Sequence, residues 1–255
     1  MEKKGQTTLF IVLGILLVAL VILYFVLVRQ DIIPPLLAPT DAATDMAAVE
    51  THIKDCLEST GGTYVTLIGL QGGYLSHAPD TYRLYNDSAV SYLCWNQEGV
   101  ATCTNRLLTL SHMEEELTDA IDQELSTCIN VKDISDDAEV AEEWKLAVAI
   151  RQNSVDLTLD YPVTIDKGRG DIASEDTFST SVDAPLGDLY QVSQDIVNDH
   201  ALYGDFDQLI YMLSKVGKYM IYKNSPYPDV VYQVRLLQDD YVFQFGIQGA
   251  EGEPA

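Results

Sequence analysis

The chain of 255 residues carries 39 Asp and Glu against 15 Lys and Arg, which gives a formal net charge of −24. This length allows one large domain or two small ones with real hydrophobic cores. Because nucleic-acid binding needs clustered Lys and Arg to neutralise phosphates, DNA and RNA are excluded as expected partners.

An apolar run without a charged side chain occupies residues 9–28. As a helix it would be about 30 Å long, the thickness of the hydrocarbon core of a bilayer, and it would satisfy its own backbone hydrogen bonds. The apolar core of a removable secretory signal is shorter, about 7–15 residues. We therefore predict a tail over residues 1–5 and a transmembrane helix over residues 6–29, with lipid contacts through residues 9–28.

The charges beside this run predict its orientation. Lys3 and Lys4 precede it, whereas the chain after Arg29 is mainly acidic. Since positive residues tend to stay on the cytoplasmic side, the N-terminus is predicted in the cytoplasm and everything after about residue 30 outside the cell membrane.

The same N-terminus also resembles the class III signal of type IV pilins, in which a membrane peptidase cuts after a glycine and keeps the apolar helix. The resemblance implies processing between Gly5 and Gln6. Two features differ from that pattern: Phe10 stands where many pilins carry Glu, and Pro34-Pro35 should end a helix that pilins usually continue. A plain single-pass anchor and a pilin-like subunit therefore both remain as interpretations.

The exterior chain begins with a Pro-rich, semi-rigid linker over residues 30–42. Helical and strand patterns follow, at residues 43–60, 80–85, 89–95 and 111–130. We expect Gly61-Gly62 to interrupt the first helix, which resumes over residues 63–70. Ser111 is the expected N-cap of the second helix, with Glu114 completing a capping box.

Strict alternation of apolar residues from Val155 to Ile165 predicts a strand in the second half of the chain. The remaining predicted strands and helices lie at residues 143–152, 175–183, 185–201, 206–215, 218–223, 230–237 and 241–248. Asp205 precedes the short helix expected at residues 206–215 and is its expected N-cap.

These patterns predict an α+β protein. One N-terminal transmembrane helix is followed by an exterior domain with a helix-rich part over residues 43–135 and an antiparallel-sheet part over residues 136–248. Residues 249–255 are predicted to be a disordered tail.

Four cysteines lie outside the membrane in this topology, and an even number in an oxidising compartment predicts disulfides. Cys94 and Cys103 flank a Gly-containing loop tip, while Cys56 and Cys128 each lie on an apolar helical stripe. We therefore pair Cys56 with Cys128 and Cys94 with Cys103. Four buried free thiols are the alternative. No Cys-x-x-Cys or Cys/His cluster has zinc spacing, so no metal site is predicted.

Other candidate motifs favour structural readings. His112 with Glu115 and Glu116 is typical of a solvated helix end, and the Arg-Gly-Asp tripeptide at residues 169–171 reads as a turn after a strand rather than an adhesion signal. The chain contains neither a Gly-x-Ser-x-Gly motif nor a P-loop. Asn86, in the one N-glycosylation sequon, is a candidate glycosylation site.

The acidity itself has two readings. Residues 30–255 carry 12 basic and 38 acidic side chains, a net charge of −26, with few lysines in the chain as a whole. A well-solvated surface would explain this, but adaptation to very salty surroundings explains it better, because salt screens the mutual repulsion of the carboxylates. We expect a halophilic protein.

Several stretches are spread in order along most of the chain. They are "KKGQTTLFIVLGI" at the start, "CLESTGGTYVTLIGLQGGYL" (56–75), "YLCW" (92–95) with Cys103 nearby, "LDYPVTIDKG" (159–168), "APLGDLYQVSQDIVNDHALYGDFDQLIYML" (184–213) and "VFQFGI" (242–247). In these motifs the chain resembles the uncharacterised single-pass membrane proteins of small-genome archaea. The resemblance implies an anchored exterior domain and carries no enzymatic activity with it.

The sequence therefore predicts a non-enzymatic, single-pass, extracytoplasmic protein of the cell envelope. Envelope proteins or glycans are the expected partners. No catalytic, cofactor-binding or metal-binding residues are predicted. A pilin-like filament subunit is the first alternative and an exterior hydrolase the second.

Overall fold

The computed structural model describes Leu17 and residues 41–96 and 102–249. The predicted transmembrane helix, apart from Leu17, and the possible processing site at Gly5 and Gln6 lie outside the described residues. Residues from Ala42 onward belong to one compact unit, and residues 1–41 to another. Within the described ranges, no helix combines the length and apolar character needed to span a bilayer.

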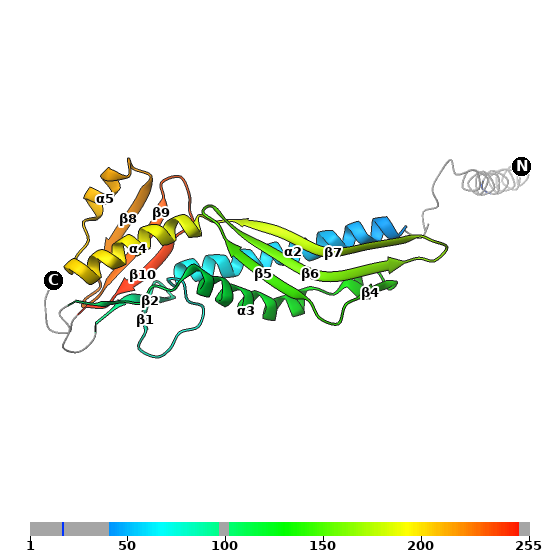
Figure 1. Ribbon diagram of the computed structural model, residues 1–255, viewed down its shortest axis with the longest axis horizontal. Coiled ribbons are helices and arrows are strands. Elements are labelled where there is room, and N and C mark those ends of the chain that lie inside the picture. The colour runs from blue at the N-terminus through cyan, green and yellow to red at the C-terminus, as the bar shows by residue number, and fades with distance from the viewer. Residues whose placement is uncertain (1–16, 18–40, 97–101, 250–255) are drawn as a thin grey trace, which may run out of the picture. The chain divides into compact units, whose positions relative to one another are not determined.

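The compact unit is of the α+β class, as the sequence predicts. Its described residues form four α-helices, namely α2 (Ala42–Leu70), α3 (Leu110–Cys128), α4 (Leu186–Tyr203) and α5 (Gln208–Ser214) (Figure 1). A short 3₁₀ helix, η1 (Val131–Asp133), follows α3.

The first sheet has four antiparallel strands: β4 (Ala138–Val140), β5 (Lys145–Ile150), β6 (Ser154–Asp166) and β7 (Ile172–Asp183). β6 pairs with β7 along one edge and with both β5 and β4 along the other. Every second residue of β6 from Val155 to Ile165 is buried, which confirms the strand that the alternation predicted. α2 packs against β6 and β7.

The second sheet is mixed and has six strands: β1 (Tyr82–Tyr85), β2 (Ser88–Trp95), β3 (Thr104–Asn105), β8 (Tyr219–Asn224), β9 (Val230–Leu236) and β10 (Phe243–Ile247). All its pairs are antiparallel except β2 with β10, which is parallel. α4 packs on β9, β10 and β2.

This pairing differs from the expected division into consecutive helix-rich and sheet-rich parts. β2 lies in the stretch expected to be helix-rich, yet it completes the sheet built by the last three strands of the chain. The buried residues of both sheets and of α2, α3 and α4 form one continuous core. The unit therefore cannot be divided at one point of the sequence into a helix-rich part and a sheet-rich part.

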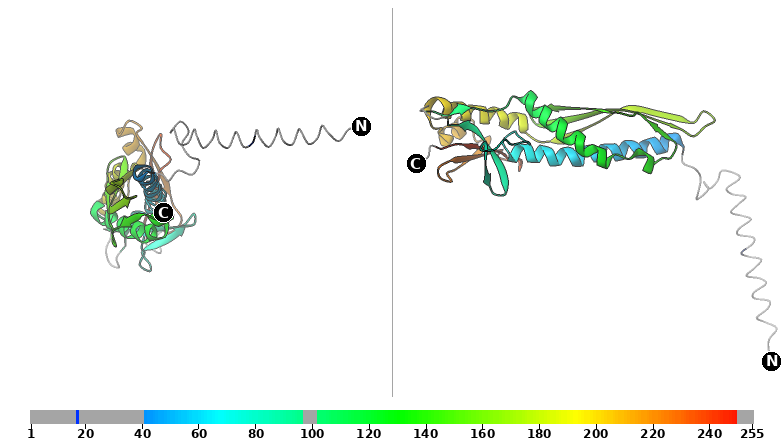
Figure 2. Two further views of the ribbon diagram at one scale, coloured as in Figure 1. Left: turned by 90° about the vertical axis from the view of Figure 1, so that its right-hand side faces the viewer. Right: turned by 90° about the horizontal axis from the view of Figure 1, so that it is seen from below.

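α2 is one uninterrupted helix of 29 residues, about 43 Å long, and it extends from the first sheet to the second (Figure 2). The expected break at Gly61-Gly62 is wrong. A Cβ on Gly61 would collide with Leu157 of β6, so glycine here permits close helix–sheet packing. That contact offsets the low helix propensity of glycine.

Two helix starts also differ from expectation. The N-cap of α3 is Thr109, whose hydroxyl accepts a hydrogen bond from the His112 N–H, rather than Ser111. Glu114 does not close a capping box; it accepts a hydrogen bond of 2.8 Å from the backbone N–H of Ile150 in β5. The N-cap of α5 is Asp207, which accepts from two backbone N–H groups.

The cap predicted for α5, Asp205, has a different partner. Its carboxylate lies 2.6 Å from the Lys223 ammonium of β8. Asp205 thus pairs with Lys223, and the nearby Asp207 caps the helix.

Candidate functional site

Two disulfides join the pairs that the sequence predicts. Cys56 of α2 is bonded to Cys128 at the end of α3, with 5.9 Å between the Cα atoms. Cys94 of β2 is bonded to Cys103, just before β3, with 5.3 Å between the Cα atoms. The first bond ties the two helices that cover the first sheet, and the second closes the end of the β2–β3 pair.

The candidate glycosylation residue, Asn86, is exposed in the turn between β1 and β2. Asn86 and Asp87 both have positive φ angles, 48° and 63°, as a two-residue hairpin turn with the twist of the strands requires. The side chain is therefore accessible for modification.

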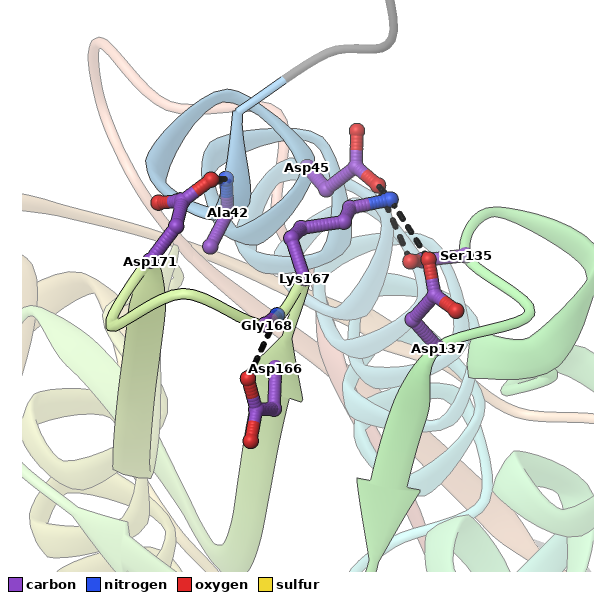
Figure 3. Close-up of polar contacts among 8 residues, drawn as sticks. All are labelled: Ala42, Asp45, Ser135, Asp137, Asp166, Lys167, Gly168 and Asp171. Carbon is purple, nitrogen blue, oxygen red and sulfur yellow. Dashed lines mark hydrogen bonds and ion pairs between the residues drawn. The ribbon is translucent and has the colours of Figure 1, made fainter.

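A cluster of polar side chains, with the backbone N–H groups of Ala42 and Gly168, lies around the first turn of α2. We call it the α2-start cluster; its members are Ala42, Asp45, Ser135, Asp137, Asp166, Lys167, Gly168 and Asp171 (Figure 3). They come from α2, from the segment between η1 and β4, and from the last residue of β6 with the turn that follows it. Segments that are distant in sequence therefore meet where α2 begins.

An ion-pair bridge forms the centre of this cluster. The Lys167 ammonium lies 2.7 Å from the Asp45 carboxylate and 2.9 Å from that of Asp137. The Ser135 hydroxyl donates a 2.9 Å hydrogen bond to Asp45, whose side chain is almost buried. Hydrogen bonds to the two carboxylates raise the pKa of Lys167, so this lysine is held in its charged form.

The β6–β7 turn supplies the second contact to α2. Asp171 accepts hydrogen bonds of 3.2 and 3.4 Å from the backbone N–H of Ala42. Gly168, Arg169 and Gly170 have φ angles of 79°, 58° and 87°, which reverse the chain within a few residues, and Asp166 accepts a bond from the Gly168 N–H. Asp171, the aspartate of the Arg-Gly-Asp tripeptide, thus accepts hydrogen bonds from the first residue of α2.

The α2-start cluster holds the first turn of α2 against the η1–β4 segment and the β6–β7 turn. Its lysine is doubly paired, and a general base or nucleophile would need a pKa shifted toward neutrality instead. α2 begins at the first residue of the compact unit, so the cluster fixes the point at which the chain joins that unit. No local pattern in the sequence predicts this site, although the glycine-rich "DKGRGD" (166–171) predicts its turn.

The residues His112, Glu115 and Glu116 border a groove between α2 and α3. The groove has a volume of about 450 Å³, and we call it the α2–α3 groove; it is lined by Tyr64, Leu67, Leu75, Ser76, His112, Glu115, Glu116, Asp119, Ala120 and Gln123. Glu116 accepts hydrogen bonds from the backbone N–H groups of Leu75 and Ser76. Among the described residues, no three His, Cys, Asp or Glu side chains are grouped so as to hold a metal ion.

One buried histidine was not singled out by the sequence. His200 of α4 is buried, and its Nε2 lies 2.8 Å from the hydroxyl of Tyr232 in β9. Burial, with the Lys223 ammonium as a second cause, lowers the pKa of His200 to about 4. The ring is therefore neutral near pH 7 and serves to pack α4 on the second sheet.

The described residues define a disulfide-bonded α+β unit with a polar fastening at the start of its long first helix. Comparison of the chain with protein-family models, with curated proteins and with solved structures found no match.

Proposed function

We propose that this protein is a single-pass, membrane-anchored component of the cell envelope, whose exterior α+β unit has a structural or binding role and performs no catalysis. The two disulfides carry this proposal. Structural disulfides form and persist in oxidising compartments and are rare in reducing ones. All cysteines of the described residues are used in them.

Two further observations support an anchored arrangement. The apolar run at residues 9–28 has the length of a bilayer-spanning helix, with lysines on its N-terminal side. The unit that follows this run in the sequence begins with the long helix α2, whose first turn is held by the α2-start cluster. Envelope proteins or glycans are the partners that we propose for the exterior unit.

Site-directed labelling tests the proposed topology. In intact cells, a membrane-impermeant maleimide should label Asp176→Cys, an exposed position on β7, without reductant. The matched variant Lys4→Cys should be labelled only after the cells are permeabilised. The native cysteines should react only after reduction. Labelling of Lys4→Cys but not Asp176→Cys in intact cells would reverse the topology, and protection of both would place the unit in the cytoplasm.

A pilin-like subunit is the alternative proposal. It is favoured by α2, a long helix that begins the unit and packs along an antiparallel sheet. Processing at Gly5 distinguishes the two proposals. Mass spectrometry of the native N-terminus should find Met1 or Glu2 for a plain anchor and Gln6 for a pilin-like subunit.

A further inference from the structure

A groove on the surface lies between α3 and the residues that connect β4 to β5. It has a volume of about 480 Å³, and we call it the Trp144 groove; it is lined by Asp122, Gln123, Ser126, Glu142, Glu143 and Trp144. Asp122 and Ser126 are one helical turn apart and therefore lie on the same face of α3. The groove thus combines one helix face with the chain that leads into β5.

Trp144 is held in one orientation by two contacts. Its indole Nε1 donates a 2.7 Å hydrogen bond to the carboxylate of Asp122. Its ring meets that of Tyr161, which is buried in β6, edge to face, with 5.3 Å between the ring centroids. The indole is half-buried and lines the groove. Because its orientation is fixed before a ligand arrives, stacking of a ligand on this ring costs little side-chain entropy.

The rest of the groove consists of groups that bind hydroxyls. The carboxylates of Asp122, Glu142 and Glu143 accept hydrogen bonds, and the Gln123 amide both donates and accepts them. All of these side chains are exposed. The Ser126 hydroxyl donates to the backbone carbonyl of Gln123, and its oxygen can accept in turn. An aromatic ring with such groups around it suits a ligand that has C–H groups on one face and hydroxyls along its edge, as a sugar ring has.

The charge of the groove limits the class of sugar. Its three carboxylates repel sugars that carry phosphate, sulfate or carboxylate groups. A simple cation is a poor candidate, because the net charge of −26 over residues 30–255 attracts cations to the surface in general, and molar salt screens that attraction beyond about 3 Å. Stacking and hydrogen bonds to uncharged hydroxyls are less sensitive to salt. The ligand that fits is therefore a neutral sugar.

We propose that the Trp144 groove binds a neutral glycan, with one pyranose ring stacked on Trp144 and its hydroxyls bonded to the surrounding carboxylates and the Gln123 amide. This inference rests on the proposed function and deepens it, because it gives the exterior unit a binding site and names the class of partner. The site lies on α3 and the β4–β5 connection. Its test needs only the purified chain, so it is independent of the membrane topology.

Fluorescence titration of the full-length chain tests the site. The chain contains two tryptophans, and Trp95→Phe, which lies under the Arg106 guanidinium and outside the groove, leaves Trp144 as the only reporter. Cellohexaose and chitohexaose, two neutral β-linked pyranose chains, are added in molar NaCl and in a detergent without a sugar headgroup. We expect at least one of them to change the Trp144 emission saturably and to shield it from acrylamide. Saturable binding of neither would overturn the proposal.

A first substitution tests the stacking contact by calorimetry. Trp144→Ala should weaken binding of the active oligosaccharide by about tenfold, the upper end of what an aromatic stacking contact contributes. Trp95→Phe is the matched control and should leave the affinity unchanged. Retained disulfides and an unchanged thermal midpoint in the same salt show that each variant folds. Equal affinities of native chain and a folded Trp144→Ala variant would contradict the proposal.

A second pair of substitutions tests the selectivity, which a merely structural role would not alter. Glu142→Gln combined with Glu143→Gln removes two charges from the groove and should allow it to bind hexagalacturonate, an acidic sugar chain that the native protein should reject. Binding of hexagalacturonate by the native chain, or shielding of Trp144 by arginine amide as strong as that by the sugars, would overturn the assignment to a neutral glycan. Failure of all sugar binding together with the expected maleimide labelling would refute this site and leave the anchored topology standing.

Discussion

The carboxylate of Asp171 accepts hydrogen bonds from the backbone N–H of Ala42, which lies 129 residues earlier in the chain. The first N–H groups of a helix have no partner within the helix, and the helix dipole makes this end favourable for an anion. The turn between β6 and β7 therefore supplies a cap for α2 from a distant part of the chain.

We predict that Asp171→Ala lowers the free energy of unfolding by about 1 kcal/mol, the usual cost of losing a helix cap. Urea denaturation of residues 36–255, monitored by circular dichroism, measures it. Asp176→Ala removes an exposed aspartate from β7, the strand that follows Asp171, and should change the stability little. Equal effects of both variants would show that the loss reflects charge alone.

The two disulfides should contribute unequally to stability. A crosslink restricts the unfolded chain more when it closes a longer loop, and the sequence separations are 72 for Cys56–Cys128 and 9 for Cys94–Cys103. Chain-entropy estimates give about 4.4 and about 2.7 kcal/mol. Denaturation of the paired Cys→Ala variants should therefore find the Cys56–Cys128 variant less stable. The opposite order would mean that packing around Cys94 outweighs loop length.

His200 should make the unit less stable in mild acid. Because its pKa is about 4 when folded, against about 6.5 when unfolded, the unfolded chain binds a proton first as the pH falls. The contribution of His200 to the free energy of unfolding is complete above pH ~6.5. It falls by about 3 kcal/mol as the pH is lowered to ~4, and changes little below that. Thermal midpoints measured from pH 7 to 4 should decline less steeply in His200→Gln. Parallel curves for the two proteins would contradict this.

Much of the fold follows from local pattern in the sequence. The alternation through β6 places one face in the core, and the positions of Cys56 and Cys128 on apolar helical stripes identify the residues that meet between α2 and α3. These signals lie within one element, where side-chain period and backbone geometry are directly linked.

Other features depend on partners that no local pattern names. Gly61 reads as a helix break until Leu157 is seen to need the space beside it. The pairing of β2 with β10 joins strands separated by most of the chain. The α2-start cluster is similar, because Asp45, Lys167 and Asp171 look like ordinary surface charges until the turn between β6 and β7 reaches α2.

The acidity of the chain gives the last prediction, which concerns salt. The net charge of −26 over residues 30–255 repels itself across about 10 Å in dilute buffer, and molar salt shortens this range to about 3 Å. The thermal midpoint of residues 36–255 should therefore rise between about 0.1 and 2 M NaCl. Neutralising three exposed acids, by Asp136→Asn, Glu142→Gln and Glu143→Gln, should raise the midpoint at low salt and flatten its salt dependence.

Sulfate at equal ionic strength separates screening from strengthened apolar burial, because only the latter depends on the anion. A midpoint that stays flat or falls with NaCl would remove the halophilic reading and leave the acidity as ordinary surface solvation.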